Sequence, residues 1–208
     1  MEALDQISTT LALSMGLAWA SGINLYATLF TLGYLANTGD MELPPDLLII
    51  ANPMVMGAAG IMYCIEFFAD KIPGIDTGWD TLHTFIRIPA GAMLAAGAIG
   101  DMNPAIEIAA GILGGGLATA THATKAGSRV LINTSPEPFT NWAASISEDV
   151  AVIGGVWACL NHPFLALIIL VLSIILIIWL LPKIWKGIKK VFRFIINLFQ
   201  KKEDQPTA

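Results

Sequence analysis

Long apolar runs separated by short polar breaks divide the chain into six segments. They cover residues 8–35, 47–70, 79–99, 104–128, 139–159 and 163–181. Each is close to the ~20 mostly apolar residues that a helix needs to cross a bilayer. The last run, PFLALIILVLSIILIIWLL, carries no charge and a single hydroxyl group. The pattern predicts an all-α polytopic membrane protein with six transmembrane or re-entrant helices.

Composition agrees with this class. The chain has 208 residues, of which 55% are hydrophobic and 13% charged, whereas soluble domains carry about 25% charged residues. The net charge of −5 hides a segregation, because seven of the eleven Lys and Arg residues follow residue 182. We expect the lipid bilayer as a partner and no nucleic acid, since these bases fit a membrane-surface helix.

The segment after the last apolar run has helical periodicity of its own. Apolar residues such as Ile184, Ile188 and Phe192 recur every three to four positions, with Lys186 and Lys190 among the residues between them. This pattern is typical of a basic amphipathic helix in the membrane interface. We therefore predict a transmembrane domain over 1–182, an interfacial helix over 183–202 and a disordered tail over 203–208.

The basic residues also predict orientation. Cytoplasmic segments of membrane proteins are enriched in Lys and Arg, so the C-terminus is expected in the cytoplasm. Six spans would place the N-terminus there too. The outer loops would then be about 36–46, 100–104 and 160–163, which contain no Lys or Arg.

Two short stretches suggest an internal repeat. Residues 16–20 read GLAWA and residues 116–120 read GLATA. Each precedes polar sequence and then an apolar segment with an embedded acid. If the similarity is real, the chain comprises two three-helix repeats, and the odd number inverts the second copy, as in many secondary transporters. Coincidence of small residues would explain the similarity equally well.

The third segment carries a polar stripe. Asp76, Asp80, His83 and Arg87 are spaced i, i+4, i+7 and i+11, so they share one helical face. Pro73-Gly74 precedes the stripe and Pro89 follows it. We predict a short polar helical segment that enters the membrane, limited at each end by proline.

Three further helices carry polar faces of complementary charge. Acids lie on the second and fifth segments, and bases lie on the fourth. The residues are Glu66 and Asp70; Asn141, Ser145, Glu148 and Asp149; and His122, Lys125 and Arg129. Pairing of Glu66 or Glu148 with Arg87 or Lys125 would offset the cost of a charge in the membrane, which is at least ~2.5–3.5 kcal/mol. Such a set is either a functional site or a group of structural ion pairs.

Three stretches rich in glycine or proline each allow two interpretations. Gly22 and Asn24 in the first segment indicate either close helix packing or a helix break that exposes backbone groups. Gly111 and Gly115 form a GxxxG pattern, which favours tight helix contact or a homo-oligomer through glycine-rich faces. Pro136 and Pro138 make the loop between the fourth and fifth segments stiff, as a gate or a simple turn.

Established catalytic motifs do not occur. The chain contains no G-x-S-x-G, HExxH, P-loop or GxGxxG sequence, so a non-enzyme is favoured and no cofactor is expected. Asp76, Asp80 and His83 are weak metal candidates, since carboxylate and imidazole suit several divalent ions, but their spacing is not a metal signature. No metal is assigned.

The combination of EFFADKIPGIDTGWDTLHTFIRIPAGA, KAGSR, NTSPEP and SISED resembles the bacterial membrane proteins grouped as domain-of-unknown-function family 4126. The resemblance covers roughly residues 10 to 160. It implies a multi-pass membrane protein, and with the predicted topology a bacterial inner-membrane location. It assigns no activity. It supports treating the charged residues as one site: Asp70, Lys71, Asp76, Asp80, His83, Arg87, Lys125, Arg129, Glu148 and Asp149.

Three functions remain as hypotheses. The first is a small transporter or channel for an ion or small polar solute. Asn24 and His122 would complete its site, with Glu66 and Glu148 as proton or cation sites. Arg87 and Lys125 would be counter-charges or anion contacts, and His83 a proton relay. The second is an enzyme acting on lipid headgroups at the cytoplasmic face. The third is a non-catalytic membrane scaffold.

Overall fold

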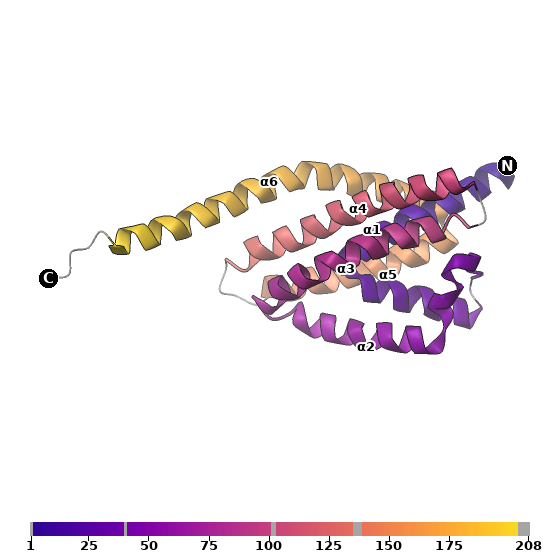
Figure 1. The fold of residues 1–208 in the computed structure, drawn as a ribbon, viewed down its shortest axis with the longest axis horizontal. Helices are drawn as coiled ribbons and strands as arrows, with labels where there is room; N and C mark the ends of the chain where they lie inside the picture. Colours follow the sequence, from indigo (N-terminus) through magenta and orange to yellow (C-terminus); the bar gives the residue numbers. More distant parts are fainter. Residues whose placement is uncertain (1, 40, 101–102, 135–138, 204–208) are drawn as a thin grey trace.

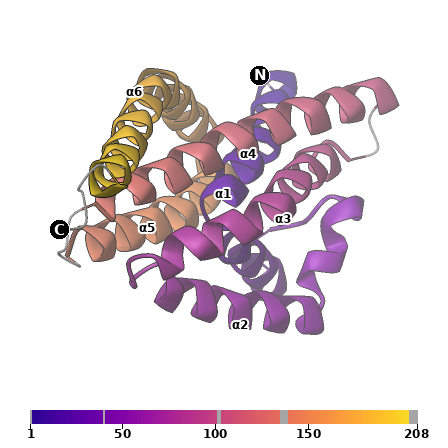
Figure 2. The same cartoon turned by 60° about the vertical axis from the view of Figure 1, so that its left-hand side comes forward.

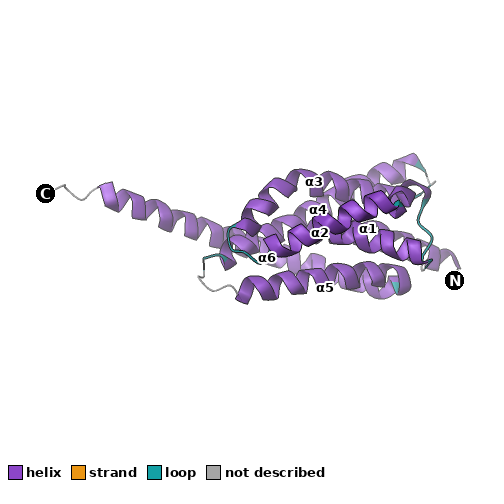
Figure 3. Ribbon diagram, turned by 90° about the horizontal axis from the view of Figure 1, so that it is seen from below, coloured by secondary structure: helices purple, strands orange, loops and turns teal. Residues whose placement is uncertain are grey.

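The structure is a computed structural model that describes residues 2–39, 41–100, 103–134 and 139–203. Seven helices follow one another along the chain, and the described residues include no strand (Figures 1 and 3). They are α1 Glu2–Thr38, the 3₁₀ helix η1 Pro45–Ala51, α2 Pro53–Ala69, α3 Ile75–Gly97, α4 Pro104–Ile132, α5 Phe139–Asn161 and α6 Pro163–Glu203. The predicted proline-rich gate or turn at Pro136 and Pro138 lies outside the described residues, as do residues 204–208 of the predicted tail. Glu203, the first residue of that predicted tail, is the last residue of α6.

The all-α prediction is confirmed, and its six segments coincide with α1 to α6 apart from their ends. Three of these helices are long and apolar enough to cross a membrane, namely α4, α5 and residues 163–194 of α6. The pair η1 and α2, bent by 65°, would count as a fourth crossing if it forms one span. Length and composition therefore support a membrane protein and leave the predicted number of six spans as a prediction.

The first predicted span is broken at Asn24. The backbone of Asn24 has φ −146° and ψ 98°, far from helical values. The Asn24 side chain stabilises the break. Its Oδ1 accepts a hydrogen bond from Ala27 N at 2.9 Å and so caps the helix that begins there. Gly22 also allows close packing, because a Cβ at this position would meet the Ala118 carbonyl oxygen at 2.6 Å. Close packing and a helix break are therefore both present, and exposure of backbone groups at the break remains a prediction.

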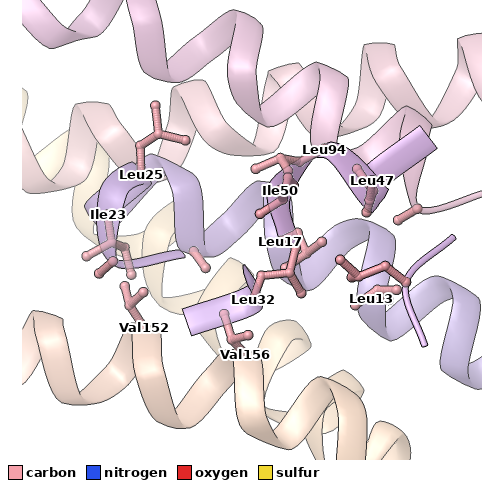
Figure 4. Packing of buried hydrophobic residues seen from close by; sticks show 14 residues of the cluster. Leu13, Leu17, Ile23, Leu25, Leu32, Leu47, Ile50, Leu94, Val152 and Val156 are labelled. Carbon is pink, nitrogen blue, oxygen red and sulfur yellow. The ribbon is translucent and has the colours of Figure 1, made fainter. Parts of the chain in front are cut away.

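The two parts of α1 fold back on one another. Ser14 in the first part donates to the Ala95 carbonyl at 2.7 Å, near the end of α3. Gly33 in the second part packs against Ile50 of η1, which lies at the same end of the bundle. In Figure 4, Leu17 lies beside Leu32, although a continuous helix would separate them by roughly 22 Å. The segment is a helical hairpin, not one straight span.

This hairpin changes the topology. Both ends of α1 lie at one end of the bundle, whereas α6 projects from the opposite end (Figure 1). The prediction that both termini share one side assumed six straight spans, and the break at Asn24 does not fit that assumption. In Figure 2, α1 lies among the other helices, and it contacts each of them.

Helix α3 follows the predicted break at Pro73-Gly74 and ends at Gly97, close to the end of the predicted third segment, 79–99. Gly74, with φ +88°, occupies a conformation suited to glycine and makes the turn from α2. The prediction that Pro89 ends the polar segment is wrong, because α3 continues through Pro89 to Gly97. Membrane helices tolerate an internal proline when neighbouring groups satisfy the freed backbone, and α3 has its most extensive contact with α4.

The glycines of α4 are used inside the chain. A Cβ at Gly114 would collide with Ala95, and a Cβ at Gly115 would meet Ala92 at 3.2 Å. Gly111 also faces α3, at Ala92 and Ala96. Of the two interpretations of the GxxxG pattern, the structure supports tight helix contact for this face. A homo-oligomer remains a prediction, and this glycine face does not support it because it already contacts α3.

Helix α6 has no break at the predicted domain boundary. It runs through Pro182 to Glu203, and Ile184 packs against Gly127 of α4. The later part projects beyond the other helices (Figure 3). The interfacial placement of residues 183–202 therefore remains a prediction. The inverted repeat also remains a prediction. Its two copies differ in the structure, since α1 breaks within the repeated region whereas α4 is continuous.

The apolar core fills the end of the bundle that holds η1 and both ends of α1. Leu17 and Leu32 are fully buried, and Leu47, Ile50 and Leu94 pack around them (Figure 4). Val152 and Val156 extend the cluster along α5. This core fixes the α1 hairpin in place and thereby positions Asn24 toward the polar half of the molecule.

Candidate functional site

The charged residues gather at the opposite end of the bundle, where α2 ends, α3 begins, α4 ends and α5 begins. Glu66, Asp76, Asp80, Arg87 and Arg129 are fully buried. Asp70, His83, His122, Lys125 and Asp149 are 2–7% exposed. The helices therefore enclose a polar cluster of a kind that is rare inside membrane proteins and normally faces the bundle interior.

Arg87 links α3 to α2. Its Nη2 donates to Glu66 Oε1 at 2.6 Å, and its Nη1 donates to Asp80 Oδ1 at 3.0 Å. The same Nη1 lies 3.2 Å from His122 Nδ1. Because an arginine can only donate, His122 Nδ1 is the acceptor, and Nε2 carries the proton toward Thr84 Oγ1 at 2.7 Å. His122 is therefore a neutral ring.

Lys125 is the centre of the cluster. Its Nζ lies 2.7 Å from Asp70 Oδ2 and 3.2 Å from Glu66 Oε1. Asp80 Oδ1 and Glu148 Oε2 are slightly farther, at 3.7 Å and 3.6 Å. One ammonium from α4 thus faces carboxylates from α2, α3 and α5. The predicted pairing of an acidic second and fifth segment with a basic fourth segment is present.

Arg129 extends the cluster to the start of α5. Its Nη2 donates to Glu148 Oε2 at 2.6 Å, and its Nη1 donates to the backbone oxygens of Asp70 and Asn141 at 3.0 and 3.1 Å. Asn141 Nδ2 in turn donates to Asn133 Oδ1 at 2.7 Å. This series of hydrogen bonds reaches α3 at Asp76, whose Oδ1 accepts from Asn133 Nδ2 at 2.7 Å.

The remaining predicted residues surround this cluster. Asn24 Nδ2 donates to Asp149 Oδ1 at 3.1 Å, so the break in α1 is tied to α5. Lys71 Nζ donates to Ser145 Oγ at 3.2 Å. His83 lies apart from the ion pairs, since its Nε2 is 3.0 Å from the Tyr26 hydroxyl and its ring stacks on Trp79 at 4.2 Å.

The charges of the linked ion pairs do not balance within the described part of the chain. Four carboxylates (Glu66, Asp70, Asp80 and Glu148) face three bases (Arg87, Lys125 and Arg129), and neutral His122 adds no charge. Five buried carboxylate oxygens have no hydrogen-bond partner among the described residues, against three buried N–H donors in the same position. The oxygens are Glu66 Oε2, Asp70 Oδ1, Asp76 Oδ2, Asp80 Oδ2 and Asp149 Oδ2, and the donors are Trp79 Nε1, Arg87 Nε and Arg129 Nε. Buried polar atoms are normally paired, so the cluster has spare capacity to bind a positive group.

A cavity of about 190 Å³ reaches the cluster from the side of α6. Lys125 and Glu148 contribute its charged lining, and Trp19 and Ile23 line it from α1 just before the break. The Glu148 side chain is 20% exposed, whereas its partners in the cluster are at most 2% exposed. A liquid water occupies about 30 Å³, so the cavity has room for a few waters or a small ion with part of its hydration shell.

The weak metal candidates do not converge. Asp80 pairs with Arg87, Asp76 accepts from Asn133, and His83 contacts Tyr26. Among the described residues, no group of three or more His, Cys, Asp or Glu side chains is arranged to hold a metal ion. The i, i+4, i+7 stripe places these residues on one face, yet each has a different partner: Arg87 of the same helix for Asp80, Asn133 after α4 for Asp76 and Tyr26 of α1 for His83.

Several residues of the cluster were not among the predicted site residues. Asn133 and Asn141 relay contacts between Arg129 and Asp76, and Thr84 orients His122. Asn141 carried a sequence signal, since it shares a helical face with Ser145 and Glu148. Tyr26 and Thr84 carried none, because their partners come from helices distant in the sequence.

Fold and site together define a helical membrane protein with a charged cluster buried between its helices. A family model described as Domain of unknown function (DUF4126) matches residues 11–183. The chain therefore belongs to this family, as the resemblance of its motifs indicated. No curated protein and no solved structure matches the chain.

Proposed function

We propose that the protein is a small membrane transporter or channel in which the buried charged cluster binds an ion or small polar solute. The observation that carries this proposal is the surplus of buried carboxylate, with unpartnered oxygens among the described residues, at a cluster that a cavity reaches. A cluster that served only to hold helices together would gain most from complete pairing, because an unpaired buried charge is strongly destabilising. The surplus therefore favours a ligand.

The break in α1 supports the same proposal. Broken helices in transporters lie at the binding site, where their free backbone groups face the ion or solute. The break at Asn24 lies against Asp149 of α5, and Ile23 beside it lines the cavity. In the proposed site Glu66 and Glu148 bind the positive group. Arg87, Lys125 and Arg129 hold the carboxylates in place.

The proposed orientation follows from the bases and the hairpin. The end of the bundle from which the Lys-rich part of α6 projects would face the cytoplasm, and the charged cluster would lie in that half of an inner membrane. Because α1 folds back at Asn24, the start of the chain would lie on the other side. Cysteine labelling of the exposed positions Asp5→Cys and Lys186→Cys in intact cells tests this arrangement, in a background in which the exposed Cys64 is replaced by Ser. Labelling of both from the same side is the contradicting result.

The transport proposal is tested by reconstituting the purified protein in vesicles. Proton flux and solute-induced currents are measured for the wild type and for Glu66→Gln and Glu148→Gln. Both variants should lose flux, since each removes a carboxylate of the cluster. Glu107→Gln is the matched control, because this acid lies in the first turn of α4, at the far end of the bundle.

Three outcomes would count against the proposal. One is a wild-type protein that is folded and yet gives no flux across a panel of cations, anions and small polar solutes. Another is transport by the two Gln variants at the rate of the wild type. The third is hydrolysis or transfer of lipid headgroups in the same vesicles, in a reaction that Asp80→Asn abolishes, which would assign an enzyme instead.

A further inference from the structure

Lys125 holds the place that a free cation would take among the carboxylates. With this side chain in the cluster, no group of three or more acids among the described residues is arranged to hold a metal ion, so a cation site would form only when the ammonium leaves. Lys125 Nζ has carboxylate oxygens of four residues within 2.7–3.7 Å. An ammonium has three donor hydrogens, so it cannot donate to all four at once, and the same oxygens of Glu66, Asp80 and Glu148 also accept from Arg87 or Arg129 at 2.6–3.0 Å. Three of these carboxylates, Glu66, Asp70 and Asp80, also keep a second oxygen without a partner in the described part of the chain. The oxygens form a cage with more ligands than its resident ammonium can use.

The structure also contains a cavity into which the Lys125 ammonium can move. Lys125 and Glu148 both line the 190 Å³ cavity, together with Thr124 and Ser128. A lysine carries its charge on a flexible four-carbon stem, so the ammonium can move from the carboxylates into the cavity by rotation of its side chain. Arg87 and Arg129, which are fully buried and held by several hydrogen bonds, lack this freedom.

We propose that the cluster binds a small monovalent cation, such as Na⁺, K⁺ or ammonium, and that the Lys125 ammonium is the resident group that this cation displaces. The inference rests on the proposed function and names its substrate class. Replacing one ammonium by one monovalent cation leaves the charge of the cage unchanged, so the carboxylates are never left bare. The cation would enter along the cavity past Glu148, the most exposed carboxylate of the cage.

Competition between the lysine and the cation gives a direct test. Purified full-length protein in detergent is titrated with NaCl or KCl at constant ionic strength, with choline chloride as the balancing salt, while thermal unfolding is followed. A ligand that binds only the folded state raises the unfolding temperature in a saturable way. Lys125→Met removes the competitor, so its response should be half-complete at a cation concentration roughly tenfold or more below that of the wild type. Lys125→Arg keeps the charge and should show no such gain.

The result that would overturn the inference is a Lys125→Met variant whose response equals that of the wild type or follows ionic strength alone. If this variant does not fold, Asp80→Asn is compared with the wild type, because it brings the acids and bases of the cluster to equal number. The saturable response of the wild type should then be lost. An equal response in the two proteins, or no response in either, would also overturn the inference.

Binding and transport can fail separately. Flux that persists in vesicles while neither Na⁺ nor K⁺ gives a saturable shift in any variant would retain the transporter and reject this cation site. A tighter cation response in Lys125→Met without flux in the wild type would retain the site and reject transport. Glu107→Gln serves as the control in both assays, since it removes an acid in the first turn of α4, at the far end of the bundle from the cluster.

Discussion

The two halves of the bundle are held together in different ways. In one half, Leu17, Leu32 and Leu94 pack with small residues such as Gly91 and Gly114, which let α1, α3 and α4 approach closely. In the other half, Arg87 and Lys125 join helices through ion pairs. Lipid is as apolar as leucine, so burial alone gives little drive for helices to associate in a membrane. The apolar half therefore depends on shape, and the charged half on pairing.

The difference shows why one half is the better candidate for function. The apolar half has large side chains filling its interior (Figure 4), and its polar groups, such as the Ser14 hydroxyl, are paired. The charged half keeps buried oxygens that no described residue pairs, and it has a cavity at its edge. The apolar half also has cavities beside it, of about 410 and 600 Å³, but no charged side chain lines either of them. Incomplete pairing of buried charge, which creates a demand for a ligand, is found in the charged half.

The largest expected effect comes from removing a base in the charged half. Arg87→Ala leaves Glu66 and Asp80 facing each other without their closest base, which should destabilise the fold by about 3–5 kcal/mol. Thermal unfolding in detergent measures this. Lys186→Ala, which removes a base from the exposed part of α6, should leave the unfolding temperature unchanged. Equal behaviour of the two variants would show that the buried pairs contribute nothing.

Overpacking the shape-dependent half should have the next largest effect. In Gly114→Leu the new side chain meets Ala95 and the Gly91 backbone, which forces α3 and α4 apart at a cost of about 1–3 kcal/mol or more. Gly116→Leu is the matched control, since a Cβ there meets nothing within 4 Å. Unfolding midpoints of both variants, measured in the same detergent, should differ by this amount. A control that unfolds as early as Gly114→Leu would contradict the packing explanation.

A cavity in the same half should cost somewhat less. Leu17→Ala removes a fully buried side chain, but in lipid the penalty is mainly the cavity term, about 1–2 kcal/mol. Leu165→Ala removes the same atoms from the lipid-facing side of α6, where Leu165 is 50% exposed. It should leave stability close to that of the wild type. A larger loss at Leu165 than at Leu17 would invert the proposed arrangement of the bundle.

The smallest effect is expected where the two halves meet. Asn24→Ala removes the cap on the second part of α1 and the hydrogen bond to Asp149, with a cost of about 1 kcal/mol. Hydrogen exchange should show faster exchange at the Ala27 amide, which loses its acceptor. Asn24→Asp should keep this amide protected, because a carboxylate can also cap a helix. Unchanged exchange in Asn24→Ala would argue against the cap.

Much of the candidate site could be predicted because its residues recur at helical spacing. The stripe of Asp76, Asp80 and Arg87 and the complementary bases of α4 are local patterns, and the cost of an unpaired charge in a membrane makes their meeting predictable. The residues that were missed, such as Tyr26 and Thr84, are polar groups without charge. Their role depends on which neighbouring helix they face, which spacing alone does not tell.

The sequence by itself determined that the chain is helical, that its apolar segments suit a membrane and that acids on two helices would need bases on another. These properties follow from periodicity and from the cost of bare charge in lipid, and both are local or additive. Only the tertiary structure decided that α1 turns back at Asn24, that α3 continues through Pro89 and that Lys125 rather than Arg87 is the centre of the cluster. The bend in α1 depends on the backbone angles of one residue, and the continuity of α3 depends on the groups around one proline. Both are set by contacts between helices that are far apart in the chain.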